Sequence, residues 1–261
     1  MKILHKLKRF SQHPLHHIKT PIAKAILYPF RFRRFASRKP EIAEAINEVR
    51  KRKITYLAKE NLQDLAEAVE DMENNLPGGA IIEAGTALGG SAIILGLSKS
   101  QNRPLRVYDA FGMIPPPTTE DGQDVQERYE TIAARESTGI DGETYYGYRS
   151  DLLGEVTQNF QSFGLEPNEH NIEMVKGLYE NTMHVDYPVA LAHLDCDWYK
   201  SLLTCLQQIE PHLIAGGRLV IDDYYKWSGC KKAVDEFFST RRQHYTFVHK
   251  SRLHIIKVTK Q

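Results

Sequence analysis

Short apolar runs and amphipathic stretches alternate along the chain from residue 80 onward. The apolar runs predict strands at residues 80–84, 105–109, 171–176, 189–194, 219–221, 245–249 and 253–258. Apolar residues at helical spacing predict intervening helices at residues 91–99, 151–163, 201–213 and 230–240. This order is typical of an α/β fold with a doubly wound, mostly parallel seven-stranded sheet, Rossmann-like, that ends in an antiparallel hairpin.

Aspartates follow the fourth and fifth predicted strands directly. They are Asp195 and Asp197 after the fourth, and Asp222 and Asp223 after the fifth. We expect the helix between these strands to end at the Gly216-Gly217 turn, which makes the strands neighbours in a right-handed βαβ unit. Either aspartate block alone could simply cap a helix or close a turn. Together at one sheet edge they favour a site for a hard divalent ion such as Mg²⁺, where a spare carboxylate can take a proton.

A glycine-rich turn from Gly85 to Ser91 follows the first predicted strand and opens a helix. It lacks the GxGxxG spacing, and it offers no basic residue to a phosphate. Glu83 is suited to accept a hydrogen bond from an ammonium group, and Asp109, at the tip of the next strand, from ribose hydroxyls. An ammonium, a ribose and apolar surroundings together describe S-adenosylmethionine. A glycine-rich turn also serves plain helix–sheet packing, so the loop alone is a weak signal.

Residues 110–150 form a long stretch without a predicted strand, which contains Pro115-Pro116-Pro117 and a helical patch near residues 125–135. Loops of this length inside compact domains are usually either functional or disordered. Because the stretch follows the second predicted strand, it could cover the site as a substrate lid. Disorder stays the alternative.

The N-terminal region differs in charge from the rest of the chain. Residues 1–53 contain 15 Lys/Arg against 3 Glu, and the remainder contains 19 Lys/Arg against 30 Asp/Glu. Prolines at positions 14, 21, 29 and 40 should interrupt any helix there, whereas residues 41–75 look helical. We divide the chain into a basic arm with a helical extension, residues 1–54, and a main domain, residues 55–261. The arm either packs on its own domain or a sister subunit, which we favour, or contacts anionic lipid, nucleic acid or an acidic partner.

Cysteine usage and hydropathy indicate the compartment. The three cysteines form no CxxC pair, which favours free thiols in a reducing cytoplasm over disulfides or a zinc site. No apolar stretch approaches the 18 residues or so of a membrane span, and the basic start lacks the apolar core of a signal peptide. We therefore expect a cytoplasmic protein, and a homo-oligomer is plausible through the helical N-terminal region.

Several motifs of the chain together resemble those of class I S-adenosylmethionine-dependent methyltransferases, specifically the macrocin O-methyltransferase family of metal-dependent sugar O-methyltransferases. The resemblance extends from about residue 55 to the C-terminus. The motifs that carry it are Glu83-Ala84-Gly85 with Gly89-Gly90-Ser91, Val107-Tyr108-Asp109-Ala110-Phe111-Gly112, Gly177-Leu178-Tyr179-Glu180-Asn181-Thr182, Leu194-Asp195-Cys196-Asp197-Trp198-Tyr199, and Ile221-Asp222-Asp223-Tyr224. The basic arm before residue 40 is not part of the family pattern.

The resemblance implies roles for individual residues. Asp195, Asp222 and Asp223 would hold Mg²⁺, and Asp197 would be the general base. Cofactor contacts would come from Glu83, Gly85, Thr86, Gly89, Ser91, Asp109 and Phe111. A small-molecule acceptor with neighbouring hydroxyls, such as a sugar, would then be methylated, and no nucleic acid is expected as a partner.

Two other functions stay open at this stage. Asp195-Cys196-Asp197 could be the DxD motif of a metal-dependent glycosyltransferase, although that motif would come late in the chain and would leave Glu83 and Asp109 unexplained. A non-catalytic binding protein with the same fold is the other alternative.

Overall fold

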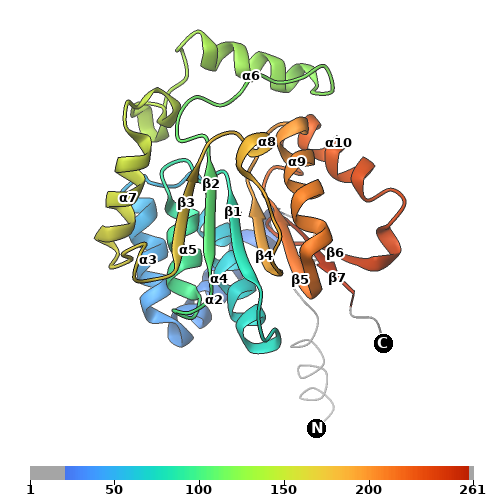
Figure 1. The fold of residues 1–261 in the computed structure, drawn as a ribbon. Coiled ribbons are helices and arrows are strands. Elements are labelled where there is room, and N and C mark those ends of the chain that lie inside the picture. Colours follow the sequence, from blue (N-terminus) through green and yellow to red (C-terminus); the bar gives the residue numbers. More distant parts are fainter. Residues whose placement is uncertain (1–20, 259–261) are drawn as a thin grey trace.

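The computed structural model describes residues 21–258, and within them seven strands form one sheet in the order β3-β2-β1-β4-β5-β7-β6 (Figure 1). Their bounds are β1 Ala80–Ala84, β2 Leu105–Asp109, β3 Ile172–Lys176, β4 Val189–Leu194, β5 Leu213–Ile221, β6 Tyr245–His249 and β7 Leu253–Lys257. β1 to β5 pair in parallel, whereas β7 is antiparallel to both β5 and β6. The predicted doubly wound sheet with a closing antiparallel hairpin is confirmed.

β5 starts earlier than we predicted from the sequence. The helix expected at 201–213 is α9, Tyr199–Ile209, and a single turn that contains Pro211 leads from it into β5. Proline removes an amide and clashes with the preceding turn, which explains the early end of the helix. The Gly216-Gly217 pair lies inside β5, where the pairing with β4 shifts register and Gly216 has φ +81°. The expectation that this pair ends the helix was wrong, because the glycines form an irregularity within the strand.

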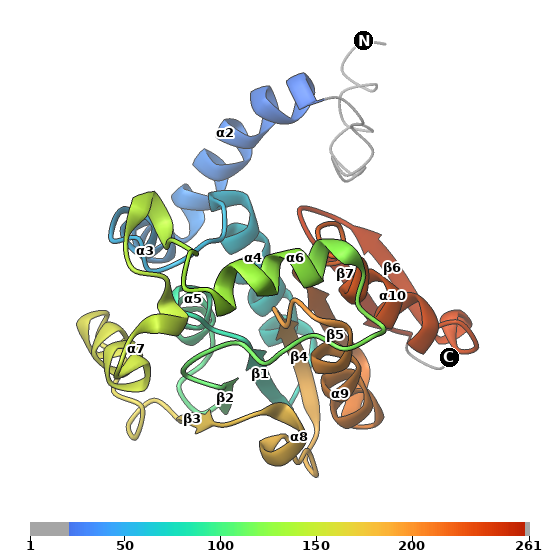
Figure 2. The same cartoon turned by 90° about the horizontal axis from the view of Figure 1, so that it is seen from above.

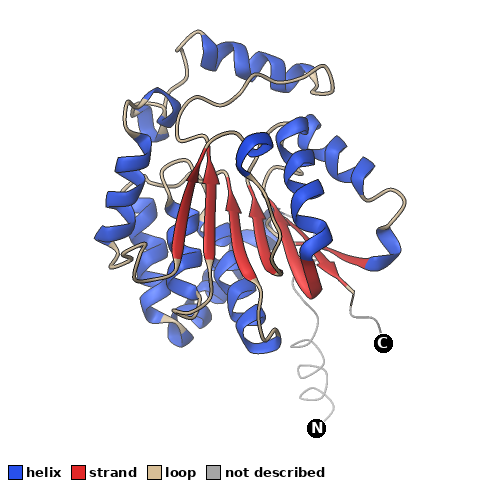
Figure 3. Ribbon diagram, in the orientation of Figure 1, coloured by secondary structure: helices blue, strands red, loops and turns tan. Residues whose placement is uncertain are grey.

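Helices cover both faces of the sheet (Figure 3). One face packs against α3 Pro40–Lys51, α4 Lys59–Asn75, α5 Gly90–Ser98 and α7 Leu152–Ser162. The other face packs against α8 Tyr179–Thr182, α9 and α10 Ser228–Phe237. No helix within residues 21–258 is both long and apolar enough to cross a membrane.

The central strands are buried on both sides. Ile81 of β1 packs in the layer of α4 and α5, and the next residue, Ile82, packs in the layer of α9 and α10. This explains why these strands are continuous apolar runs, without the alternation of a half-exposed sheet. All three cysteines are buried with free thiols, as predicted.

Part of the basic N-terminal region packs on the main domain as α2, Pro21–Arg38. α2 runs through Pro29, so our expectation that the prolines interrupt any helix here was wrong at this position. Pro21 and Pro40 instead occupy the first residues of α2 and α3, where a missing amide costs little. Phe35 is buried, and Arg31 forms an ion pair with Asp64 of α4. The remainder of the predicted arm, residues 1–20, lies outside the described residues, and the division at residue 54 stays a prediction.

Residues 110–150, which we call the cover segment, lie over one edge of the sheet. Its helix α6, Gln123–Ala133, crosses above the carboxyl ends of the strands (Figure 2). Two short 3₁₀ turns, Ile140–Gly142 and Tyr146–Tyr148, complete the segment. The structure therefore has this stretch in the position expected for a lid.

Candidate active site

Carboxylates from two strands converge at the covered edge of the sheet. Asp195 and Asp197 follow β4 and Asp223 follows β5, and oxygen atoms of the three side chains lie within 4.8 Å of one another. Asp223 is buried and the other two are half-buried. The prediction that the two aspartate blocks meet at one edge is confirmed for these three residues.

Crowding of these acids raises their affinity for protons. Burial, followed by repulsion from Asp222 and Asp223, raises the pKa of Asp195 well above its ordinary value. Burial and the charge of Asp223 raise the pKa of Asp197 to about 8, although Lys226 opposes the shift. Three like charges in so small a space cannot all stay ionised without a positive charge among them. The group is therefore suited to hold either protons or a cation.

Asp222 is not part of this group, because protein cations already engage it. Its Oδ1 accepts a hydrogen bond from Arg252 Nε at 2.5 Å and lies 3.5 Å from His193 Nε2. Burial raises the pKa of Asp222, but His193 and Arg252 outweigh burial, and the net shift is downward. The structure thus brings together Asp195, Asp197 and Asp223, and a metal-binding role for Asp222 stays a prediction.

Glu83 lies buried below the glycine loop. Its Oε2 is 2.8 Å from His193 Nδ1, its neighbour in the register of β1 and β4, and its Oε1 accepts a hydrogen bond from the Ser91 hydroxyl. Burial lowers the pKa of His193, but Glu83 and Asp222 outweigh burial and raise it to about 10. His193 is therefore a cation between two carboxylates. Glu83 thus holds Ser91 at the start of α5, and the contact that we expected it to make with an ammonium group of the cofactor stays a prediction.

Asp109 organises the glycine loop from the tip of β2. Its Oδ2 accepts hydrogen bonds from the amides of Thr86 at 2.7 Å and Ala87 at 3.2 Å, and its Oδ1 accepts one from the amide of Phe111 at 2.7 Å. Gly85 beside it has φ +85°, and a Cβ there would lie 1.9 Å from the carbonyl oxygen of Asp195. Only glycine fits this close approach. The loop after β1 and the loop after β4 are therefore packed backbone against backbone.

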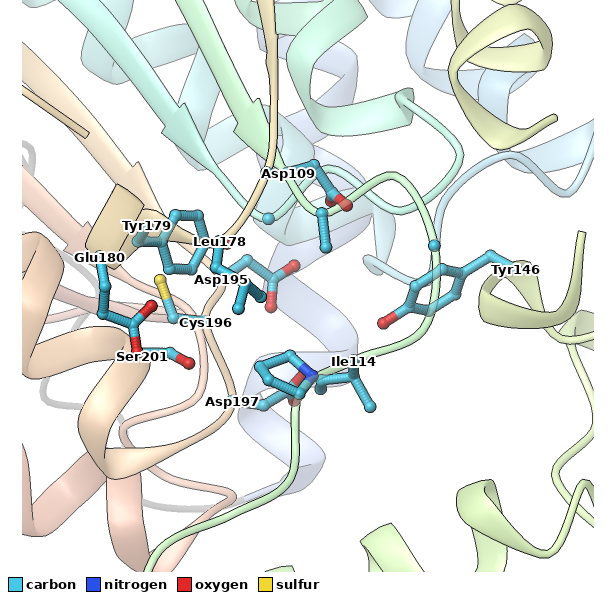
Figure 4. A pocket seen from close by; sticks show the side chains of 15 residues that line it. Asp109, Ile114, Tyr146, Leu178, Tyr179, Glu180, Asp195, Cys196, Asp197 and Ser201 are labelled. Carbon is cyan, nitrogen blue, oxygen red and sulfur yellow. The ribbon is translucent and has the colours of Figure 1, made fainter. Parts of the chain in front are cut away.

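Two adjoining cavities lie beneath the cover segment, with about 490 and 770 Å³ of empty space, which includes solvent at their open mouths. The smaller cavity lies among the loops after β1, β2, β3 and β4 (Figure 4). The larger cavity lies between the acidic group and α6. The residues that line both are Gly85, Asp109, Ile114, Tyr146, Asp195 and Asp197. Figure 4 shows the Tyr146 hydroxyl and the Asp195 carboxylate facing the smaller cavity.

Only some of the predicted cofactor residues reach these cavities. Gly85 and Asp109 line both of them. The others are buried and line neither of these two cavities, namely Glu83, Thr86, Gly89, Ser91 and Phe111. A Cβ at Gly89, for example, would meet the side chains of Val156 and Phe160, so this glycine serves helix packing.

Sequence analysis missed the residues that close the larger cavity. They are Arg128, Tyr145 and Tyr146 from the cover segment and Lys226, Trp227 and Arg252 from the loops after β5 and β6. An irregular segment has no periodicity that could have marked its tyrosines. A signal did exist for the smaller cavity, because Leu178, Tyr179 and Glu180 belong to one of the motifs of the family pattern.

Three residues at this edge have left-handed backbone conformations. Ala87 after β1, Phe111 after β2 and Asp197 after β4 have φ of 47°, 45° and 55°. Residues other than glycine rarely adopt this conformation, and such strain collects at functional sites. The strained positions thus lie in the loops after β1, β2 and β4.

The cover segment is hydrogen-bonded to the first turns of α9 and α10. Asp121 Oδ1 accepts a hydrogen bond from the amide of Tyr199 at 2.8 Å, and Asp124 Oδ2 accepts one from the amide of Ser228 at 2.9 Å. Both N-cap residues are tryptophans, and neither helix has a side-chain cap of its own. An aspartate at this position satisfies a free amide and interacts favourably with the helix dipole. The cover segment therefore supplies the caps that these helices lack.

The two N-cap tryptophans position parts of the site. Trp198 and Trp227 pack edge to face, with ring centroids 5.8 Å apart. Trp227 Nε1 donates a hydrogen bond to Asp197 Oδ1 at 2.7 Å, and Trp198 Nε1 donates one to the Pro115 carbonyl at 3.0 Å. One indole therefore holds a carboxylate of the acidic group, and the other holds the start of the cover segment.

The sheet order, the glycine loop after β1 and the acidic group after β4 and β5 define a class I methyltransferase, the fold of S-adenosylmethionine-dependent enzymes. The family model of macrocin O-methyltransferase (TylF) matches residues 39–249, and the chain belongs to this family. The protein is therefore an O-methyltransferase, and the glycosyltransferase and non-catalytic alternatives are set aside.

Relatives and solved structures agree with this family. Demethyldecarbamoylnovobiocin O-methyltransferase of Streptomyces niveus is 27% identical over 190 residues, 70% of this chain and 67% of that protein. The 8-demethyl-8-(2,3-dimethoxy-alpha-L-rhamnosyl)-tetracenomycin-C 4'-O-methyltransferase of Streptomyces olivaceus is 27% identical over 184 residues, 68% of this chain but only 64% of that protein. The structure of the O-methyltransferase NovP superposes with a TM-score of 0.65 at 20% identity, over 78% of this chain and 82% of that one, which shows the shared fold.

Proposed function

We propose that the protein is a Mg²⁺-dependent O-methyltransferase that moves a methyl group from S-adenosylmethionine to a hydroxyl of a sugar or another diol-bearing small molecule. The observation that carries this proposal is the group of Asp195, Asp197 and Asp223, whose oxygens lie within 4.8 Å of one another. The group lies where two cavities meet, one for each reactant.

The donor set fits a hard divalent cation. Oxygen ligands from carboxylates are those that Mg²⁺ prefers, and the pKa values of Asp195 and Asp197 are raised by burial and then by the charges of the neighbouring aspartates. We assign Asp195 and Asp223 as ligands, with Asp222 as a third through Oδ2, because Arg252 engages its Oδ1. When bound, the ion would lower the pKa of a coordinated acceptor hydroxyl.

Asp197 is the proposed general base. Trp227 fixes its Oδ1, which leaves Oδ2 to receive the proton of the acceptor hydroxyl. The acceptor oxygen forms its bond to the methyl carbon as the sulfur–carbon bond of the sulfonium breaks, and the hydroxyl proton passes to Asp197. Much of the rate should come from holding both reactants in line at the shared cavity wall.

The smaller cavity is the proposed place of S-adenosylmethionine. Gly85 allows the backbone to approach the ligand closely. A carboxylate can accept about four hydrogen bonds. Asp109 accepts three, from backbone amides, so it can accept one more from a ribose hydroxyl. Leu178 and Tyr179 supply an apolar and aromatic wall.

The larger cavity is the proposed place of the acceptor. Its lining is rich in aromatic side chains, namely Tyr56, Tyr145, Tyr146, Trp198 and Trp227. Flat aromatic faces beside polar groups suit a sugar ring, which has apolar faces and a polar edge. The relative from Streptomyces olivaceus is named for the 4'-O-methylation of a product that carries a rhamnosyl group, which agrees with a sugar acceptor.

Calorimetry and methyl-transfer assays test the proposal together. We expect S-adenosylmethionine to bind the wild-type protein, and Mg²⁺ to be required for transfer to diol-bearing glycosides. Asp223→Asn should abolish Mg²⁺ binding and transfer while S-adenosylmethionine affinity stays nearly unchanged. Asp197→Asn should still bind Mg²⁺ but lose turnover, and Asp71→Asn, at a residue that lines neither cavity, is the control. Full transfer in the presence of a metal chelator would disprove the metal-dependent mechanism.

A further inference from the structure

The larger cavity contains two cationic side chains that form no ion pair with a carboxylate of residues 28–258. Arg128, Lys226 and Arg252 all line it, and Arg252 is neutralised by Asp222. Among residues 28–258, no carboxylate oxygen lies within 4.0 Å of a side-chain nitrogen of Arg128 or Lys226, and residues 1–27 contain no Asp or Glu. These two cations are therefore available to a ligand.

Aromatic rings hold both cations at the cavity wall. The Arg128 guanidinium lies over the Tyr145 ring at 5.6 Å, and Lys226 Nζ lies over the Trp227 ring at 4.7 Å. A cation–π contact positions a charge without using its N–H donors. Lys231 of α10 differs from these two cations, because it forms an ion pair with Asp235. The donors of Arg128 and Lys226 thus stay open while their charges are held in place.

The two cations come from different elements and lie close to the reaction centre. Arg128 belongs to α6 of the cover segment, and Lys226 belongs to the loop after β5. The indole beneath Lys226 is the one that donates to Asp197, so this lysine is one ring away from the proposed base. Lys226 also offsets part of the negative charge of the acidic group. A divalent ion would do the same, and charge compensation does not explain the position of Arg128.

We propose that Arg128 and Lys226 form a subsite for a phosphate group carried by the acceptor, so that the methylated sugar is a sugar phosphate or a nucleoside diphosphate sugar. This inference rests on the proposed methyl transfer and narrows its acceptor. The planar fork of arginine and the point charge of lysine together suit the oxygens of a phosphate. The sugar hydroxyls would face the acidic group, and the phosphate would lie outward between the cover segment and the loop after β5.

The test compares acceptors that differ only in charge, with S-adenosylmethionine and Mg²⁺ present. Three probes are used: dTDP-rhamnose, rhamnose 1-phosphate and the uncharged methyl rhamnoside. We expect the KM for the phosphorylated acceptors to be at least about tenfold below that for methyl rhamnoside. Arg128→Gln and Lys226→Gln should each raise the KM for a phosphorylated acceptor about tenfold more than they raise the KM for methyl rhamnoside. Use of dTDP-rhamnose alone would identify the nucleoside diphosphate form, and use of both would identify the phosphate itself.

Matched controls separate the subsite from general charge effects. Arg128→Lys and Lys226→Arg should keep most of the preference, and Lys231→Gln should change nothing. Titration with dTDP provides a readout without turnover, and the double variant Arg128→Gln/Lys226→Gln should bind it at least about tenfold more weakly. Unchanged dTDP binding in that variant, or equal KM values for charged and uncharged acceptors, would overturn the subsite. If Mg²⁺ and S-adenosylmethionine bind but none of the three acceptors is methylated, the proposed sugar acceptor fails, and the dTDP titration still decides on the subsite.

Discussion

Asp64 of α4 and Ser251 of the β6–β7 turn are hydrogen-bonded, although 187 positions separate them in the chain. Ser251 donates both its amide and its hydroxyl to Asp64 Oδ2, and Asp64 Oδ1 accepts a hydrogen bond from Arg31 of α2. The next residue, Arg252, holds Asp222. A continuous set of contacts therefore connects the N-terminal helix with the aspartates of the active site. Arg31, Ser251 and Arg252 all lie outside the residues that the family model matches.

Asp64→Ala should destabilise the protein strongly. The Asp64 side chain is 2% exposed and that of Arg31 is 18% exposed, so the substitution leaves a mostly buried guanidinium with Glu67 as its one remaining ion-pair partner among residues 28–258. Loss of one partner of a buried pair costs about 3–5 kcal/mol. Urea unfolding measures the change. Glu48→Ala, which breaks an exposed pair with Lys51, should cost at most about 1 kcal/mol, and a similar cost for both variants would contradict the structural role of Asp64.

Gly85→Ala should be far more damaging than Gly142→Ala. Both glycines have positive φ, +85° and +83°, so each alanine has backbone strain of roughly 1–2 kcal/mol. Only at Gly85 does the new Cβ also meet backbone, the Asp195 carbonyl oxygen, whereas nothing lies within 4 Å at Gly142. We expect Gly85→Ala to lower the melting temperature further and to weaken S-adenosylmethionine binding. Equal melting temperatures would show that the close approach to Asp195 is absent in solution.

The metal-free protein should lose stability as pH rises, because the pKa of Asp197 is raised from 3.8 to about 8. The folded state binds this proton more tightly than the unfolded chain does, so the stabilisation is complete below about pH 4 and is lost as pH rises through about 8. A Mg²⁺ ion beside Asp197 would disfavour its protonated form, so the affinity for Mg²⁺ should increase across this window. Calorimetry in buffers of different ionisation enthalpy would detect the released proton.

Asp197→Asn is the control for this pH dependence, because other groups also titrate. The difference in unfolding free energy between wild type and variant should slope downward from about pH 5 to 8 in the absence of metal. A flat difference would show that Asp197 keeps an ordinary pKa.

Trp227→Phe should lower kcat about tenfold with little change in the KM of the acceptor. The substitution keeps a ring against Trp198 but removes the donor to Asp197 Oδ1, and a hydrogen bond to a charged group contributes about 1.5–3 kcal/mol. Steady-state kinetics measure the effect. Trp198→Phe is the matched variant, because it removes the hydrogen bond to the Pro115 carbonyl and leaves that to Asp197 intact. We expect it to raise the KM of the acceptor more than it lowers kcat.

The sequence was most informative where the chain is buried on both sides. Continuous apolar runs placed β1, β2 and β4 at their observed bounds, because strands covered by helices on both faces have few other solutions. β5 was the exception, since it contains Gly216-Gly217, a pair that resembles a turn. The pattern of apolar residues predicts which strands are buried. An irregularity within a strand depends instead on the strand with which it pairs, here β4.

The site was predictable in part. Asp195, Asp197 and Asp223 meet as expected, because parallel strands bring their carboxyl ends together. Asp222 pairs with Arg252, which lies 30 residues further along the chain. The sequence around Asp222 therefore does not predict this partner. Similarly, no sequence pattern around Glu83 predicts that its carboxylate contacts His193 and Ser91.

Asp121 and Asp124 connect the position of the cover segment with the first turns of α9 and α10. If the cover segment swings outward to admit an acceptor or release a product, the amides of Tyr199 and Ser228 lose their acceptors at the same moment. Each opening event then loosens the first turns beside the catalytic loops, and each closure tightens them again. The first turns of α9 and α10 would thus be fully hydrogen-bonded only while the cover segment lies over the cavities.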